Sequence, residues 1–142
     1  MSEAAAALTP ASGIPLPVVT ELSRPYWDGL AEGELRFQRC AACGNAWLPA
    51  REECPACLAD AWAWEASGGG GRVISWVIYR QGVHPAFADR VPYNVAVVEL
   101  DEGPRLITSI DAPEDALAIE QPVRLVPWSE QGVHLARFAP VS

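Results

Sequence analysis

The four cysteines of the chain are the residues whose type and spacing most clearly predict a chemistry. They form two C-x-x-C pairs, Cys40 with Cys43 and Cys54 with Cys57, and ten residues separate the pairs. Two such pairs facing each other can place four thiolates tetrahedrally around a zinc ion, each about 2.3 Å from it. Gly44 directly follows the first pair and allows the backbone to turn through a conformation that larger residues avoid. The pattern therefore predicts a four-cysteine metal site.

Disulfides and iron are the alternatives to zinc. No stretch approaches the ~20 apolar residues of a membrane span, and the first residues lack the basic and apolar regions of a signal peptide. We therefore expect a cytoplasmic protein, in which structural disulfides are rare. A four-thiolate site also accepts iron, so the sequence does not decide whether the bound metal is zinc or iron. Because a closed four-thiolate site offers no position to water or substrate, we expect the metal to be structural.

The rest of the composition favours no catalytic chemistry and argues against broad nucleic-acid binding. The formal net charge is −8, whereas phosphate binding needs concentrated positive charge. The chain has only two histidines, His84 and His134, and neither can be matched from sequence with a nucleophile and an orienting group. We expect His134 to lie on the face of a strand. The sequence thus predicts no catalytic residues.

The elements around the cysteines are short. Ser23 and Pro25 are typical of a helix start, and Gly33 is typical of a helix end, so we expect a helix over Arg24–Glu32. The segment 34–40 alternates between apolar and polar side chains and indicates a strand that leads into Cys40. A second alternating segment, 61–66, follows the cysteines. These elements must form the scaffold of the metal site.

Four consecutive glycines at 68–71 separate two parts of the chain. A phosphate-binding loop would need a lysine and a following helix, but a β pattern follows instead. We therefore interpret the glycines as a flexible hinge between modules. The expected organisation is a flexible leader (1–21), a helix with a metal ribbon (22–66) and a β domain (67–142).

The segment after the glycines has the pattern of an all-β domain. Five strands are expected, at 73–81, 93–100, 105–111, 122–128 and 133–139, with turns at 101–104 and 129–132. A short helical turn is expected between the third and fourth strands. This spacing is typical of a five-stranded Greek-key barrel of the OB type, and an SH3-like barrel is the alternative.

At this point the ordered part of the chain, from about Arg24 to Ser129, resembles a known family. The motifs that carry the resemblance are the helix before Cys40, the P-x-R segment at Pro49 and Arg51, C-P-x-C, H-P-x-F, P-Y and VELDEGPR. The family consists of small proteins associated with acyl-CoA metabolism. The resemblance implies a mainly β fold: an N-terminal helix, a rubredoxin-like zinc ribbon and a five-stranded OB-fold barrel. The four glycines depart from the shorter SGRG-like turn of relatives.

The resemblance implies an accessory role and not a self-sufficient enzyme. Members of the family bind thiolase-superfamily proteins, among them retro-aldolases that remove steroid side chains, thiolases and acyltransferases, and some accompany hot-dog-fold hydratases. The catalytic residues would lie on the partner, and acyl-CoA is a possible ligand at the shared surface. The alternative hypothesis is a nucleic-acid-binding zinc-ribbon and OB module, because both folds often bind single strands.

Several side chains are candidates for contact with a partner or acyl-CoA. Aromatic residues are enriched in the cores of protein interfaces, and arginine binds phosphate and carboxylate through a two-pronged contact. For each of them an ordinary packing or surface role is the alternative. The candidates are Arg24, Tyr26, Trp27, Arg39, Trp47, Arg51, His84, Phe87 and Tyr93.

Overall fold

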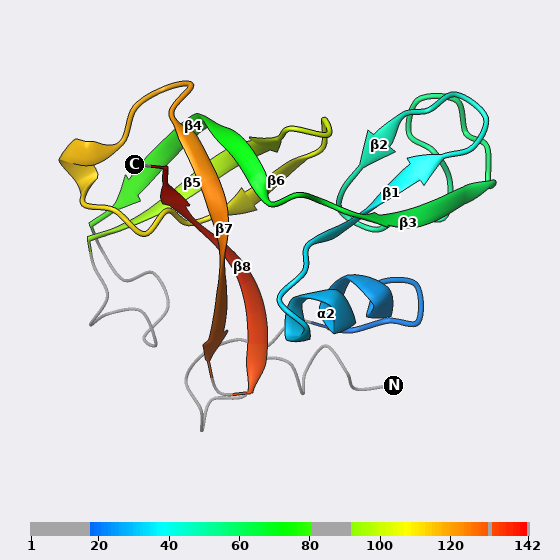
Figure 1. Cartoon of the computed structure of the whole chain (residues 1–142), viewed down its shortest axis with the longest axis horizontal. Helices are drawn as coiled ribbons and strands as arrows, with labels where there is room; N and C mark the ends of the chain where they lie inside the picture. Colours follow the sequence, from blue (N-terminus) through cyan, green and yellow to red (C-terminus); the bar gives the residue numbers. More distant parts are fainter. Residues whose placement is uncertain (1–17, 81–91, 131, 142) are drawn as a thin grey trace.

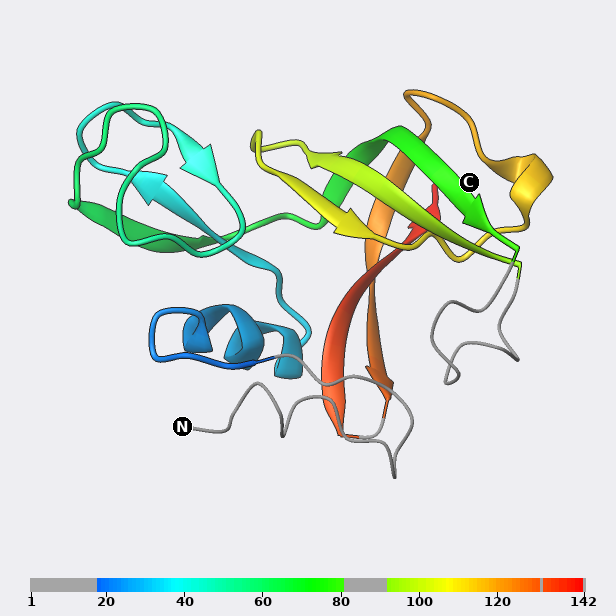
Figure 2. The ribbon, with the colours of Figure 1, turned by 180° about the vertical axis from the view of Figure 1, so that it is seen from behind.

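The computed structural model describes residues 18–80, 92–130 and 132–141, and in them the chain forms two β lobes with one helix between them. The smaller lobe is a three-stranded sheet of order β2-β1-β3, and the larger one is a five-stranded sheet of order β6-β5-β4-β7-β8. Helix α2 lies below the smaller lobe and beside the long β7–β8 hairpin (Figure 1; Figure 2 shows the same arrangement from behind). The expected mainly β fold with one N-terminal helix is confirmed.

The smaller sheet is the ribbon that carries the cysteines. Strand β1 (Arg36–Cys40) pairs antiparallel with β2 (Ala46–Trp47) on one side and with β3 (Trp62–Ala66) on the other. The strand that the alternating pattern of residues 34–40 predicted is therefore confirmed as β1. Gln38 is fully buried, although the alternation placed it on the polar face.

The side chain of Gln38 is buried because both ends of its amide pair with the backbone of the loop at Arg51. Its amide nitrogen donates to the backbone oxygen of Arg51, and its amide oxygen accepts from the Arg51 N–H, both at 2.8 Å. Pairing both ends of the amide removes the penalty for burying it. Gln38 thus fixes the loop that leads to the second cysteine pair.

Helix α2 (Arg24–Ala31) matches the predicted helix to within one residue. Ser23 occupies the position before it, but the Ser23 hydroxyl bonds to Thr20 and makes no side-chain cap to the helix. Gly33 follows at a φ of 81°, as expected for a glycine that ends a helix. Within the described ranges, no helix has the length and apolar character needed to cross a membrane.

The apolar face of α2 packs on the barrel. Leu30 of the helix, and Leu35 shortly after it, belong to the same buried cluster as Val98, Val123 and Phe138 of the larger sheet. The sequence grouped the helix with the ribbon, because the two are adjacent in the chain. In the structure the helix shares the hydrophobic core of the barrel and also contacts β1 of the ribbon, where Arg36 donates to the Pro25 oxygen at 3.1 Å.

The larger sheet contains all five strands expected after the glycines. They are β4 (Gly70–Tyr79), β5 (Tyr93–Leu100), β6 (Arg105–Thr108), β7 (Pro122–Glu130) and β8 (Val133–Pro140). The short 3-10 helix η2 (Glu114–Ala116) stands where a helical turn was expected. Strand β5 alternates between buried and half-buried side chains along its whole length, as a barrel strand must when one face covers the core.

The sheet curls until its last strand meets the segment after β6. Ile110 forms a parallel bridge with Phe138, the N–H of Asp111 donates to the Phe138 oxygen at 2.7 Å, and the N–H of Phe138 donates to the Ser109 oxygen at 3.2 Å. The buried side chain of Asn94 holds the same segment from inside. It donates to the Ile110 oxygen at 2.9 Å and accepts from the Ile110 N–H at 2.7 Å.

The four glycines do not form the expected flexible hinge, and this prediction was wrong. Gly70 and Gly71 are the first residues of β4. The Gly68 N–H donates to the Glu102 carboxylate at 2.8 Å, and the Gly69 oxygen accepts from the Leu125 N–H at 2.7 Å. A side chain at Gly71 would bring its Cβ to 2.7 Å from the backbone oxygen of Glu99. A glycine is needed at position 71 because β4 and β5 approach closely there.

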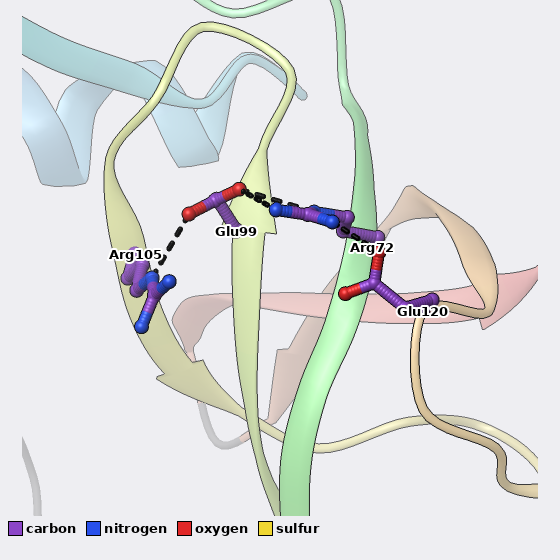
Figure 3. Close-up of polar contacts among 4 residues, drawn as sticks. All are labelled: Arg72, Glu99, Arg105 and Glu120. Carbon is purple, nitrogen blue, oxygen red and sulfur yellow. Dashed lines mark hydrogen bonds and ion pairs between the residues drawn. The ribbon is translucent and has the colours of Figure 1, made fainter.

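A chain of ion pairs crosses the outer face of the barrel. Arg72 on β4 contacts Glu99 on β5 at 2.6 Å and also pairs with Glu120, and Glu99 contacts Arg105 on β6 at 2.9 Å (Figure 3). Hydrogen bonds from Arg72 and then Arg105 lower the pKa of Glu99 below its ordinary value of 4.5. The network therefore links three neighbouring strands and the loop before β7.

Glu99→Gln should reduce the loss of stability on acidification. Because the folded state lowers the pKa of Glu99, its contribution is present above the unfolded pKa and is lost as pH falls through the folded value. The effect should be modest, since the side chains of the network reach solvent. Urea unfolding at pH 7 and pH 3 should show a smaller difference for Glu99→Gln than for the unaltered chain. Glu53→Gln, an exposed change, should keep the full difference.

Candidate metal centre and the surfaces beside it

The four cysteine sulfurs lie together at the tip of the ribbon. All four sulfur atoms are within 4.8 Å of one another, and the Cys40–Cys57 and Cys43–Cys54 separations are both 3.6 Å. A tetrahedral zinc site with metal–sulfur distances of about 2.3 Å places its sulfurs about 3.8 Å apart. The cage therefore fits a four-coordinate metal ion, as the spacing predicted.

Two backbone turns of the same form build the cage. In the first, the Cys40 N–H donates to the Asn45 oxygen at 2.8 Å, and the Cys40 oxygen accepts from Gly44 at 3.1 Å. In the second, Cys54 makes the equivalent bonds with Ala59 at 2.9 Å and with Leu58 at 2.8 Å. Gly44 has a φ of 81° and Leu58 a φ of 67°, so the second turn places a leucine in a conformation that favours glycine.

The polar surroundings of the sulfurs favour thiolates at two positions. Hydrogen bonds from the backbone N–H groups of Cys43 and Ala42 lower the pKa of Cys40. Burial alone would raise the pKa of Cys54, but the N–H groups of Cys57 and Ala56 lower it to about 6. Thiolates are the form that binds metal. Four thiolates this close would repel one another, and a divalent cation removes that repulsion.

Trp47 lies in the small core beneath the cage. Its side chain is 4% exposed and packs with Cys40 and Cys54, while Ala59 and Trp62 cover the cluster. No described residue accepts a hydrogen bond from its indole N–H. The side chain of Trp47 is therefore not presented on the surface of this chain, and its contact with a partner stays a prediction.

Two of the arginines proposed as contacts have different surroundings. Arg39 pairs with Glu65 at 3.1 Å, donates to the Gly44 oxygen at 2.9 Å and covers the ring of Phe37. Its guanidinium thus supports the first cysteine turn. The side chain of Arg51 is exposed, and its backbone is held by Gln38. Arg39 therefore has a structural role in this chain, whereas Arg51 remains available.

The aromatic pair of α2 faces two hollows. Tyr26 and Trp27 contact each other edge to face, with ring centroids 5.0 Å apart, and both side chains are half-buried. Burial raises the pKa of Tyr26 to about 12. The two rings line both a cavity of about 640 Å³ and a groove of about 1000 Å³. Arg24, at the start of the helix, is exposed.

The remaining candidates lie near or beyond the ends of β4 and β5. Tyr93 is half-buried and stacks on Tyr79, with ring centroids 5.2 Å apart. His84 and Phe87 lie outside the described residues. The structure therefore brings Tyr26, Trp27 and Tyr93 to one groove and keeps Arg39 and Trp47 in the ribbon.

Sequence reasoning missed the two buried amides that hold the loops around these sites. Gln38 fixes the ribbon loop at Arg51, and Asn94 fixes the barrel at Ile110. Asn94, Ala96 and Val98 are alternate residues of β5, so their side chains point to the same, inward face. The spacing in the sequence thus indicates that the polar side chain of Asn94 enters the core. A buried amide side chain needs hydrogen-bond partners, and for Asn94 these are the backbone N–H and oxygen of Ile110.

Two family models match consecutive parts of the chain. Residues 27–63 match the ChsH2 rubredoxin-like zinc ribbon domain, and residues 64–127 match the ChsH2 C-terminal OB-fold domain. Together they cover the cage, the ribbon sheet and most of the barrel. They favour the OB-type barrel over the SH3-like alternative.

Individual proteins and solved structures are similar over most of the chain. A DUF35 domain-containing scaffold protein of Methanothermobacter thermautotrophicus is 36% identical, and the match covers 77% of this chain and 83% of the relative. A probable enoyl-CoA hydratase alpha subunit of Thermomonospora curvata is 34% identical over 82% of this chain. The match spans only 36% of that subunit's length.

A solved structure of the Ltp2-ChsH2(DUF35) aldolase superposes with a TM-score of 0.77 at 32% identity. The match covers 87% of this chain and 98% of the compared chain. The consecutive ribbon and OB-fold matches, with the similarity to the archaeal scaffold protein over most of both chains, place the protein in a family. The chain belongs to the DUF35 family, with a ChsH2-type zinc ribbon followed by a ChsH2-type OB-fold.

Proposed function

We propose that the chain is a non-catalytic accessory subunit that binds a thiolase-superfamily partner and supports its acyl-CoA chemistry. The observation that carries the proposal is the likeness to a chain of the Ltp2-ChsH2(DUF35) aldolase along nearly the whole of that chain. A relative named as a scaffold protein supports a binding role. The closed cage supports it as well, since four cysteine ligands leave a zinc ion no site for substrate.

The zinc ion proposed for the cage would have a structural role. Cys40, Cys43, Cys54 and Cys57 would hold it, and it would join the two cysteine turns into one fold. Four reduced thiols fit the cytoplasm, where disulfides rarely persist. Metal analysis of protein produced without added zinc distinguishes zinc from iron.

The partner surface that we propose is the cavity of about 640 Å³ between α2, the ribbon and the barrel. Leu48, Pro49 and Ala50 line it from the ribbon, Tyr26 and Trp27 from the helix. The barrel contributes Val97, Leu106 and Ile107. Arg105 is the one charged residue among the described residues that line it, so the surface suits an apolar segment of a partner protein.

Ile107→Glu should weaken the complex at least about tenfold, because it places a charge in an apolar interface core. The Ile107 side chain is 76% exposed, so the fold of the isolated chain should tolerate the change. The measurement is affinity for a purified thiolase-like protein from the same host, with aldolase or thiolase activity as a second readout. Ile119→Glu, at a 57% exposed isoleucine outside the cavity, is the matched control and should bind normally.

The distribution of charge argues against the nucleic-acid-binding alternative. Five arginines, Arg36, Arg39, Arg72, Arg80 and Arg105, pair with glutamates, so their charges are neutralised within the chain. The outer face of β5 presents Tyr93, Val95, Val97 and Glu99, and so carries one aromatic ring and no cation, where a single-strand binder would present several of each. If the chain bound oligonucleotides at physiological salt and bound no thiolase-like protein, the accessory role would be wrong.

A further inference from the structure

A groove of about 1000 Å³ lies at one end of the barrel, and it adjoins the proposed partner cavity at Tyr26, Trp27 and Ile107. All three tyrosines of the chain, Tyr26, Tyr79 and Tyr93, line it, together with Trp27 and Trp128. They come from the helix, from the ends of β4 and β5, and from β7. Aromatic side chains from four elements thus gather around one space.

A guanidinium group that has no carboxylate partner among the described residues lies at this groove. Arg137 on β8 places its central carbon 4.5 Å from the ring centroid of Trp128, and it forms no ion pair with a described residue. Its buried Nε atom has no hydrogen-bond partner in the described part of the chain. An unsatisfied buried donor is costly, and a guanidinium held against an aromatic ring is well placed to bind an anion.

Asp111 is the only carboxylate among the described residues that line the groove. Its side chain is exposed, and no ion pair joins it to Arg137, although its backbone N–H donates to the neighbouring Phe138. The positive charge of Arg137 is therefore not neutralised by contact. Asp111 should instead weaken the binding of any anion by repulsion across the groove.

The position of the groove matches the ligand site of OB-folds, which lies near the loops that join the first to the second strand and the fourth to the fifth. Tyr79 and Tyr93 flank the first of these connections, and Trp128 and Leu135 flank the second. We propose that the groove binds a small organic anion with a flat apolar body. The body would lie against the aromatic rings, and a carboxylate or phosphate group would bind Arg137.

The groove shares Tyr26, Trp27 and Ile107 with the proposed partner surface, but Arg137 and Trp128 line the groove alone. The proposal is therefore tested at Arg137 on the isolated chain and does not rest on the accessory role. The test is calorimetric titration of the purified full-length chain with 2-naphthoate and, in parallel, with ADP. 2-Naphthoate carries a carboxylate on a flat apolar ring system, and ADP carries phosphates on a planar base. We expect saturable one-to-one binding of at least one of the two ligands. The ligand that binds shows whether the groove prefers a carboxylate or a phosphate group.

Arg137→Gln should weaken that binding at least about tenfold, since a charge-assisted bidentate contact is lost. Asp111→Asn should strengthen it, because a like charge is removed. Arg124→Gln is the matched control, as Arg124 is an exposed arginine on the adjacent strand that does not line the groove. Circular dichroism establishes that each variant is folded. Saturation in neither arm, or equal affinity of Arg137→Gln and the unaltered chain, would overturn the proposal.

Discussion

Cys54→Ser should remove the metal and unfold the ribbon while the barrel stays folded. Cys54 is fully buried, and its sulfur lies 3.6 Å from that of Cys43 and accepts from the Ala56 N–H at 3.3 Å. A serine hydroxyl stays protonated and is a poor zinc ligand, so zinc should fall from about one ion per chain to near zero. The small cluster around Trp47 cannot hold the ribbon alone.

The barrel should survive because its core is a separate cluster that includes α2. Zinc content by mass spectrometry and limited proteolysis measure the two effects, and new cleavage should appear only between residues 40 and 62. Ala56→Ser is the matched control, since it keeps the backbone N–H that donates to Cys54. The partner complex should be lost with the ribbon, because Leu48, Pro49 and Ala50 line the proposed surface. A complex that forms normally with Cys54→Ser would show that the ribbon is outside the interface.

Asn94→Ala should destabilise the barrel by about 2–4 kcal/mol, because it leaves the buried N–H and oxygen of Ile110 without partners. These two bonds hold the segment through which the sheet meets its last strand. The measurement is urea unfolding followed by far-ultraviolet circular dichroism. The zinc content should not change, since Asn94 lies outside the ribbon.

Gln121→Ala is the matched control for Asn94→Ala. Gln121 makes the same kind of contact, accepting from the Ala118 N–H at 3.2 Å and donating to the Ala116 oxygen at 3.0 Å, but its bonds are exposed. Water can replace them, so its loss should cost less than about 1 kcal/mol. Equal effects of the two variants would contradict the role given to burial at Asn94.

Local signals predicted most of the elements because the physics that sets them acts over a few residues. Gly33 ends α2, and the alternation of residues 34–40 predicted the strand β1. The cysteine spacing predicted the cage, since each pair and its turn form one local unit. The same locality explains one error, because the glycines interpreted as a hinge are part of a strand. It also explains why the sequence did not show that the helix next to the ribbon packs on the core of the barrel.

The sequence by itself determined the four metal ligands, the number and order of the strands, and the acidic charge that disfavours nucleic acid. Only the tertiary structure decided which side chains meet. It buried Trp47 under the cage, gave Arg39 a glutamate partner and brought Tyr26, Tyr79 and Tyr93 to one groove with Arg137. These outcomes depend on how distant segments pack around two cores. No local pattern of residue types records that packing.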